Sequence, residues 1–319
     1  MLMSVIILGL VFGFALLIWS ADRFVVGAVG LAHLFNLPPI VIGVVVIGFG
    51  TSAPELLISG VSAWQGNSGL ALGNALGSNI TNITLILGVT ALLTPILVSK
   101  QTLVREFPIL LFATGLTWLL LQDSFLSFTD AVILMVSLFI AITFLTLASK
   151  NAESVADEEV EYAGSLITAI SWTAIGLALL LVSSNILVSS SVKLAHYFGI
   201  SDLVIGLTIV AIGTSLPELA ASVTGAIKHH TDLAIGNVVG SNIFNTLGVV
   251  SVPGFIQSYT IPKEALTRDF PIMIGLTLLL LVLSFSTQKK AGIYRISGIL
   301  LLICFISFQI LLYKQSVSA

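Results

Sequence analysis

The chain has 319 residues, of which 57% are hydrophobic and 8% charged, and its formal net charge is −3. Soluble domains carry about 25% charged residues, so this composition excludes a soluble globular protein. The lack of a basic patch excludes a nucleic-acid partner, and a single cysteine, Cys304, excludes a disulfide framework or a thiolate metal cage. We therefore expect a multi-pass membrane protein whose partner is the lipid bilayer, with no obligatory protein partner evident.

Apolar segments of about 20 residues, the length that crosses a bilayer, recur along the whole chain. They predict ten transmembrane helices in two groups of five. The first half (1–148) has expected helices at 4–34, 39–65, 69–95, 103–122 and 126–148. The second half (164–319) has them at 164–198, 203–228, 232–257, 265–285 and 292–313. The acidic stretch 149–163 lacks the spacing of a calcium loop, so we interpret it as a solvated linker.

The two halves repeat each other with an offset of 163 residues. Gly-Thr-Ser-Ala-Pro-Glu-Leu at 50–56 returns as Gly-Thr-Ser-Leu-Pro-Glu-Leu at 213–219. Gly-Asn-Ala-Leu-Gly-Ser-Asn-Ile at 73–80 returns as Gly-Asn-Val-Val-Gly-Ser-Asn-Ile at 236–243. Because five spans is an odd number, the second copy enters the membrane upside down, as in many secondary transporters. We therefore expect an all-α fold of two inverted five-helix repeats, and the loop cations favour both termini outside.

Each repeat places one glutamate, Glu55 or Glu218, in an apolar helix beside residues that disturb the helical backbone. Pro54 cannot donate a hydrogen bond to the carbonyl of Gly50, and the second repeat has the same arrangement. The predicted helix-breaking residues are Gly50, Pro54, Gly213 and Pro217. An ionised glutamate within the membrane costs several kcal/mol, so two glutamates in duplicated contexts indicate a functional site.

A polar stripe with residues four apart follows in each repeat: Asn74, Ser78 and Asn82 in the first, with its twin in the second. The glycines that flank the stripes predict close helix packing: Gly73, Gly77, Gly236 and Gly240. Four such helices would surround one point with two carboxylates, hydroxyls, amide oxygens and free carbonyls. An all-oxygen shell suits calcium or sodium rather than zinc, copper or iron.

With these motifs the chain resembles the cation/calcium antiporter superfamily, the sodium/calcium exchangers and their prokaryotic relatives. The blocks at about 43–82 and 206–245 are similar to that family's alpha repeats. The resemblance implies that helices 2, 3, 7 and 8 surround the ion site and that helices 1 and 6 slide across it. Separately, the short loops between the expected helices predict a prokaryotic plasma or inner membrane. The implied calcium ligands are Glu55 and Glu218 with the carbonyls of Thr51 and Thr214. The implied sodium sites add Ser52, Ser215, Ser78, Ser241 and carbonyls near Gly48 and Ala211, with Asn82 as a site-lining amide.

Asn245 stands where potassium-dependent members of the superfamily have an aspartate. The site then holds two carboxylates rather than three, which argues against potassium co-transport. One Ca²⁺ or two protons would neutralise the two glutamates, whereas three Na⁺ would leave one positive charge. Exchange of Na⁺ for Ca²⁺ is therefore expected to be electrogenic.

Three other functions remain open at this stage. A proton-driven calcium antiporter fits nearly the same ligand set, and a passive cation channel is a weaker alternative. An intramembrane enzyme lacks a recognisable catalytic motif in the apolar segments. No cofactor is expected beyond the transported ions.

Asp22 and Arg23 are adjacent within the first helix, and we interpret them as snorkelling residues or a structural ion pair.

Overall fold

The computed structural model describes residues 2–35, 37, 39–66, 68–149, 164–198, 211–285 and 291–318. Nearly all of these residues are helical, which confirms the all-helical prediction. The acidic linker from residue 150 onward and the first part of the predicted helix 203–228 lie outside the described residues.

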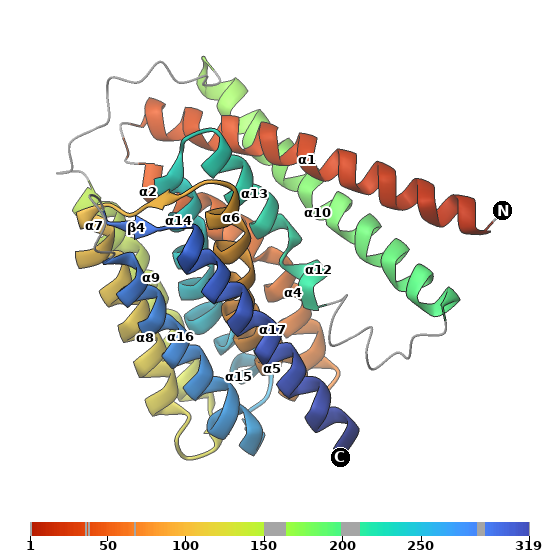
Figure 1. The fold of residues 1–319 in the computed structure, drawn as a ribbon. Coiled ribbons are helices and arrows are strands. Elements are labelled where there is room, and N and C mark those ends of the chain that lie inside the picture. Colours follow the sequence, from red (N-terminus) through yellow and green to blue (C-terminus); the bar gives the residue numbers. More distant parts are fainter. Residues whose placement is uncertain are drawn as a thin grey trace.

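Two long helices, α1 (Leu2–Leu34) and α10 (Leu166–Tyr197), pack side by side along their length. They are equivalent members of the two repeats and cross one end of the bundle obliquely (Figure 1). Each close approach uses a glycine. A Cβ on Gly13 would lie 3.0 Å from the side chain of Leu187, and one on Gly176 would lie 2.6 Å from the backbone of Phe24. The two helices therefore form one antiparallel unit.

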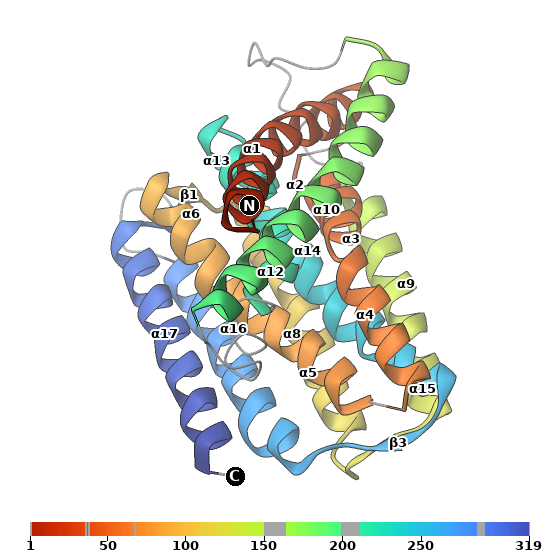
Figure 2. The same ribbon diagram turned by 90° about the vertical axis from the view of Figure 1, so that its right-hand side faces the viewer.

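The remaining helices form a bundle beneath this pair (Figures 1 and 2). In the first repeat it comprises α2 (Pro39–Ile42), the π-helical η1 (Gly43–Gly48), α3 (Phe49–Thr51), α4 (Ala53–Trp64), α5 (Ser68–Thr81), the π-helical η2 (Asn82–Ile86), α6 (Leu87–Leu93), α7 (Lys100–Val104), α8 (Glu106–Leu120) and α9 (Phe128–Ser149). In the second repeat it comprises α12 (Ala211–Thr214), α13 (Leu216–Ile227), α14 (Thr231–Ile243), the π-helical η4 (Phe244–Val249), α15 (Ser251–Ile256), the π-helical η5 (Ala265–Asp269), α16 (Phe270–Ser284) and α17 (Arg295–Ser318). The span Thr231–Ile256, which begins with α14, lies at the centre and is the most completely buried of the candidate spans in the described part of the chain.

Two short antiparallel ribbons join the repeats. Strand β1 (Ile96–Leu97) pairs with β4 (Gly292–Ile293), and β2 (Phe125–Leu126) pairs with β3 (Tyr259–Thr260). Strands β1 and β3 are separated by the repeat offset of 163 residues, and the ribbons lie at opposite ends of the bundle (Figures 1 and 2). Equivalent strands at opposite ends are what inverted repeats require.

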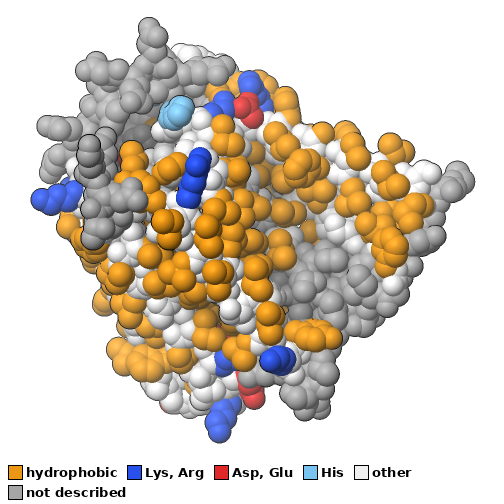
Figure 3. Space-filling model, in the orientation of Figure 1, with side chains coloured by type: hydrophobic (Ala, Val, Ile, Leu, Met, Phe, Trp, Pro, Cys, Tyr) orange, Lys and Arg blue, Asp and Glu red, His pale blue; other side chains and the backbone are white. Residues whose placement is uncertain are grey.

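Eight helices in the described part of the chain are long and apolar enough to cross a membrane. A ninth results if the bent pair Gly43–Thr51 and Ala53–Trp64 is counted as one span. Apolar side chains cover the middle of the visible face, and charged side chains gather near its two ends (Figure 3). These features define a multi-pass membrane protein, while the number ten remains a prediction because the seventh expected span, 203–228, begins outside the described residues.

Candidate functional site

Both repeats interrupt a helix immediately before the glutamate. Helix α3 ends at Thr51 and α4 begins at Ala53, with Ser52 between them at φ −81° and ψ 5°. Ser215 separates α12 from α13 with nearly the same angles, φ −91° and ψ 6°. Each proline lies in the first turn of the helix that follows, where a missing N–H costs least. The first interruption bends the span by 46°.

The interruptions place Glu55 and Glu218 in the first turns of α4 and α13, and both side chains are fully buried. Ser78 of α5 donates a hydrogen bond to Oε1 of Glu55 at 3.3 Å. Ser52 donates to Oε1 of Glu218 at 3.4 Å, so this contact joins the two repeats.

Several buried oxygens in this region have no hydrogen-bond partner among the described residues. They are Oε2 of Glu55, Oε2 of Glu218, Oγ of Ser215, Oδ1 of Asn82 and Oδ1 of Asn245. A buried polar atom without a partner costs about 1–3 kcal/mol, so such a concentration points to a ligand. All five are oxygen acceptors, which are the donor atoms that Ca²⁺ and Na⁺ require.

A second cluster lies where η1 and α3 meet α14. The Thr51 hydroxyl donates to the carbonyl of Ile47 at 3.0 Å, and its oxygen lies 3.2 Å from Oδ1 of Asn237 and 3.5 Å from Oγ of Ser241. Ser241 in turn donates to the carbonyl of Gly48 at 3.3 Å. The structure thus brings Thr51, whose carbonyl was an expected calcium ligand, together with Gly48 and Ser241, which were expected at the sodium sites.

Two asparagines fix the backbone of the glutamates. Nδ2 of Asn74 donates to the carbonyl of Glu55 at 3.3 Å, and Nδ2 of Asn237 donates to the carbonyl of Glu218 at 3.1 Å. Asn237 also donates to Oγ of Ser222 at 2.8 Å. Neither asparagine was among the predicted ion ligands, although both occupy the same place in the repeated Gly-Asn motif.

An amide network connects α5 with α14 and η4. Nδ2 of Asn82 donates to Oδ1 of Asn242 at 3.0 Å, Asn242 donates to the carbonyl of Asn79 at 3.4 Å, and Asn79 donates to Oγ1 of Thr246 at 2.7 Å. Asn82 is the first residue of η2, and Asn245 lies within η4. Single π-helical turns occur often at functional sites. Sequence reasoning missed Asn79 and Asn242, although both belong to the duplicated Gly-Ser-Asn-Ile motif.

The glycines of the two stripes have different surroundings. A Cβ on Gly240 would lie 2.6 Å from the backbone of Val44, so α14 and η1 cross in backbone contact. Among the described residues, none lies within 4 Å of the positions where Gly73 and Gly77 would carry a Cβ. The repeat equivalent of η1 spans residues 206–211, most of which lie outside the described residues. The packing predicted for Gly73 and Gly77 therefore stays a prediction.

A cavity of about 540 Å³ reaches the site from one side. Its described lining includes Gly73, Gly77, Asn74, Ser78 and Thr214. Its wall also contains the ion pair of Arg268 with Asp269, whose Nε and Oδ1 atoms are 2.7 Å apart. Ser78, which is hydrogen-bonded to Glu55, forms part of the cavity wall.

The second repeat supplies the remaining predicted residues. Ala211 begins α12, and the carbonyl of Gly213 accepts a hydrogen bond from Oγ of Ser184 in α10 at 2.7 Å. Ser215 is buried with an unpartnered hydroxyl. Among the described residues, no three His, Cys, Asp or Glu side chains form a group that could hold a metal ion. A cation between the glutamates would therefore take its other ligands from hydroxyls, amides and carbonyls.

The fold and the site define a polytopic membrane transporter with a buried oxygen-rich centre to which both repeats contribute. A sequence model of the family described as "Sodium/calcium exchanger protein" matches residues 5–155 and 168–314. The chain belongs to this sodium/calcium exchanger family and is a membrane antiporter.

Its relatives include the protein named "Putative antiporter CaxA" of Alkalimonas amylolytica, with 45% identity over 95% of this chain and 97% of CaxA. The inner membrane protein YrbG of Escherichia coli is 36% identical over 96% of each chain. The sodium/calcium exchanger MaX1 of Methanosarcina acetivorans is 30% identical over 97% of each chain.

The fold is similar to that of the sodium-calcium exchanger NCX_Mj. A structure of NCX_Mj soaked with 10 mM Na⁺ and zero Ca²⁺ superposes with a TM-score of 0.83 at 30% identity, covering 96% of this chain and 98% of that one. A structure soaked with 2.5 mM Na⁺ and 0.1 mM Ca²⁺ gives a TM-score of 0.81 at 31% identity, covering 94% and 96%.

Proposed function

We propose that the protein exchanges Na⁺ for Ca²⁺ across a membrane by alternating access. The observation that carries the proposal is the pair of fully buried glutamates, Glu55 and Glu218, each with one carboxylate oxygen that no described residue satisfies. Two buried carboxylates form a site that one divalent cation neutralises. The names of MaX1 and NCX_Mj as sodium/calcium exchangers support the same ion pair.

The ligand assignment follows the repeat symmetry. Glu55 and Glu218 bind Ca²⁺ together with the carbonyls of Thr51 and Thr214. Na⁺ uses the surrounding hydroxyls, amides and carbonyls, with both glutamates shared between the ions. The proposed additional Na⁺-site residues are Ser52, Ser78, Asn82, Ser215, Ser241, Asn245, Gly48 and Ala211.

The charge of the site determines the electrical character of exchange. With two carboxylates, the Ca²⁺-loaded site is neutral and a site loaded with three Na⁺ carries one positive charge. Moving that charge across a membrane is worth about 2.3 kcal/mol per 100 mV. Exchange is therefore electrogenic, and the amide at Asn245 makes it independent of K⁺.

The proposed architecture has ten spans with both termini outside the cell. The position of YrbG as an inner membrane protein supports a plasma or inner membrane location in a prokaryote. The paired helices α1 and α10 slide over the neutralised site, because moving apolar helices across two uncompensated charges costs several kcal/mol.

Calcium uptake into proteoliposomes tests the proposal. Vesicles loaded with Na⁺ are expected to accumulate Ca²⁺. Because net positive charge leaves the vesicle as Ca²⁺ enters, an inside-positive potential set with an ionophore is expected to give faster uptake than an inside-negative one. Vesicles with a proton gradient and no Na⁺ serve as the matched comparison. Uptake driven by the proton gradient alone would assign H⁺ as the coupling ion, and uptake that needs neither gradient would indicate a channel.

A further inference from the structure

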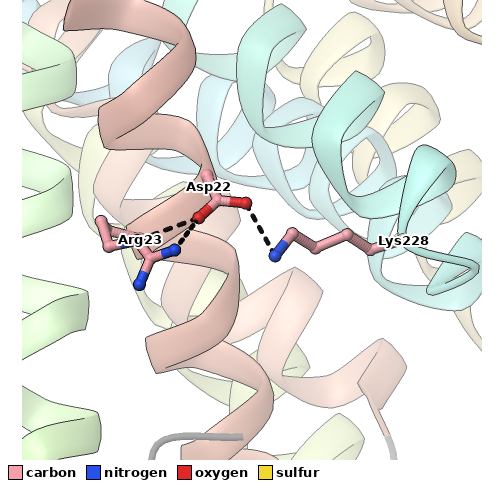
Figure 4. A network of polar contacts seen from close by, with 3 residues as sticks. All are labelled: Asp22, Arg23 and Lys228. Carbon is pink, nitrogen blue, oxygen red and sulfur yellow. Dashed lines mark hydrogen bonds and ion pairs between the residues drawn. The ribbon is translucent and has the colours of Figure 1, made fainter. Parts of the chain in front are cut away.

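We infer that Asp22 of α1 and Lys228 at the end of α13 form a one-sided latch, which stabilises one of the two access states of the transporter. The inference rests on the proposed alternating access. Nζ of Lys228 lies 2.7 Å from Oδ1 of Asp22. The two side chains extend toward each other from different repeats, with Arg23 on the other side of the same carboxylate (Figure 4). Their side chains are 24% and 29% exposed, so the pair is partly shielded from solvent.

The latch holds more than one helix. Arg23 donates from Nε to Asp22 at 2.9 Å, and its guanidinium carbon lies 5.5 Å from the ring centre of Trp172 on α10. Trp172 also meets Trp19 of α1 edge to face, with ring centres 6.2 Å apart. Because α1 and α10 are joined in this way, the contact between Asp22 and Lys228 fixes the whole α1–α10 unit to α13.

The repeat symmetry shows which contact would replace the latch in the opposite state. In a transporter built from inverted repeats, the opposite state arises when the two repeats exchange conformations. A contact between Asp22 and Lys228 then becomes a contact between their equivalents, which are Asn185 and Gln65. Gln65 terminates α4 as Lys228 terminates α13, with nearly equal backbone angles. Neither equivalent residue carries a charge.

The contacts of the two long helices with the bundle are asymmetric as well. Helix α1 packs against α13, whereas α10 makes no comparable contact with α4 among the described residues. No hydrogen bond joins Asn185 to Gln65 in the described part of the chain either. The ion pair is therefore made in this state and has no charged counterpart in the other.

The latch is separate from the ion ligands. Asp22, Arg23 and Lys228 share no hydrogen bond with Glu55 or Glu218 in the described structure. Removing the pair should change the populations of the two states and leave the intrinsic ion affinity of each state intact. A partly exposed ion pair corresponds to about a three- to fivefold change in a population ratio.

The direct test measures the two populations by pulsed electron paramagnetic resonance. Spin labels at Trp64 on α4 and Val182 on α10, in a Cys304→Ser background, report how closely these helices approach. In the wild-type protein the shorter separation is expected to be the minor one. Lys228→Met and Asp22→Asn should each enlarge the minor population about threefold, and the double variant should add nothing further. Lys228→Arg keeps the pair and should keep the wild-type distribution.

A second measurement uses transport. In vesicles of defined orientation, Lys228→Met should raise the half-saturating Ca²⁺ concentration at one face and lower it at the other by a similar factor, because apparent affinity follows the accessible population. The pair Asn185→Asp with Gln65→Lys supplies the missing counterpart latch and should shift both values in the same directions as Lys228→Met. A misfolded fraction would reduce only the amount of active protein.

Unchanged distance populations in Lys228→Met would overturn the latch, whatever the transport assays give. Absence of Ca²⁺ transport by the wild-type protein would instead defeat the proposed function, while the distance measurement would still decide whether the ion pair holds the helices. A change of the half-saturating Ca²⁺ concentration in the same direction at both faces would also count against the latch.

Discussion

Ser52 of the first repeat donates a hydrogen bond to Glu218 of the second, with 3.4 Å between Oγ and Oε1. The equivalent hydroxyl, that of Ser215, has no partner among the described residues, and Glu55 is instead bonded to Ser78 of its own repeat. Two nearly identical sequence motifs thus make different contacts. Ser52 therefore has a structural role, its hydrogen bond to Glu218, in addition to the ion-binding role proposed for both serines, whereas Ser215 has only the proposed ion-binding role.

We expect Ser52→Ala to lower the stability of the ion-free protein by about 1 kcal/mol, because the substitution removes a hydrogen bond to a buried carboxylate. Ser215→Ala should leave that stability unchanged. Both substitutions should reduce the stabilisation that Na⁺ confers, since each removes a proposed ligand. Thermal unfolding in detergent with and without Na⁺ measures both effects. Equal losses of stability in the ion-free Ser52→Ala and Ser215→Ala variants would contradict the asymmetry between the repeats.

Replacing either glutamate should abolish exchange. Glu55→Gln and Glu218→Gln preserve shape but leave one charge to balance Ca²⁺, so affinity should fall by at least about 100-fold. Isothermal titration with Ca²⁺ and flux in proteoliposomes provide the measurements. Glu106→Gln is the matched control, since Glu106 is also a buried acid, 3% exposed, but lies at the start of α8 outside the site. Undiminished exchange in Glu55→Gln would overturn the proposed site.

Asn245→Asp tests the charge count. Asn245 is fully buried and neither atom of its amide has a partner among the described residues, so an added carboxylate would face the same centre. The site would then hold three negative charges, and one Ca²⁺ would no longer neutralise it. We expect slower Ca²⁺ exchange, because the Ca²⁺-loaded site would carry one negative charge across the membrane unless a further monovalent cation is bound. The wild-type flux should be the same in K⁺ and in choline, and a K⁺ requirement would refute the role given to the amide.

Gly240→Ala should destabilise the protein by about 1–3 kcal/mol, because its Cβ would lie 2.6 Å from the backbone of Val44 and two helices would have to move apart. Gly115→Ala in α8 is the control, since nothing among the described residues lies within 4 Å of that position. The control should be neutral or slightly stabilising, because alanine has the higher helix propensity. Thermal unfolding of the two variants decides between packing at Gly240 and a general sensitivity of helical glycines.

The sequence alone determined the membrane class, the helical fold, the repeat and its family. Hydrophobic segments of bilayer length depend only on local composition, and the offset between Glu55 and Glu218 is visible in the chain itself. Pro54 and Pro217 indicated an interrupted helix because proline acts on the turn that precedes it. The structure places the interruptions at Ser52 and Ser215, two residues before each proline.

Only the tertiary structure decided which polar residues meet. Asn82 and Asn242 are 160 residues apart, and their hydrogen bond depends on how η2 packs against α14. The contact of Lys228 with Asp22 equally depends on where the α1–α10 unit lies relative to α13. Sequence periodicity assigns a residue to one face of its own helix, but the rotation and sliding of one helix against another follow from the packing of all of them. For that reason the duplicated motifs led to a set of proposed ligands, whereas the asymmetry between the repeats could not be predicted from them.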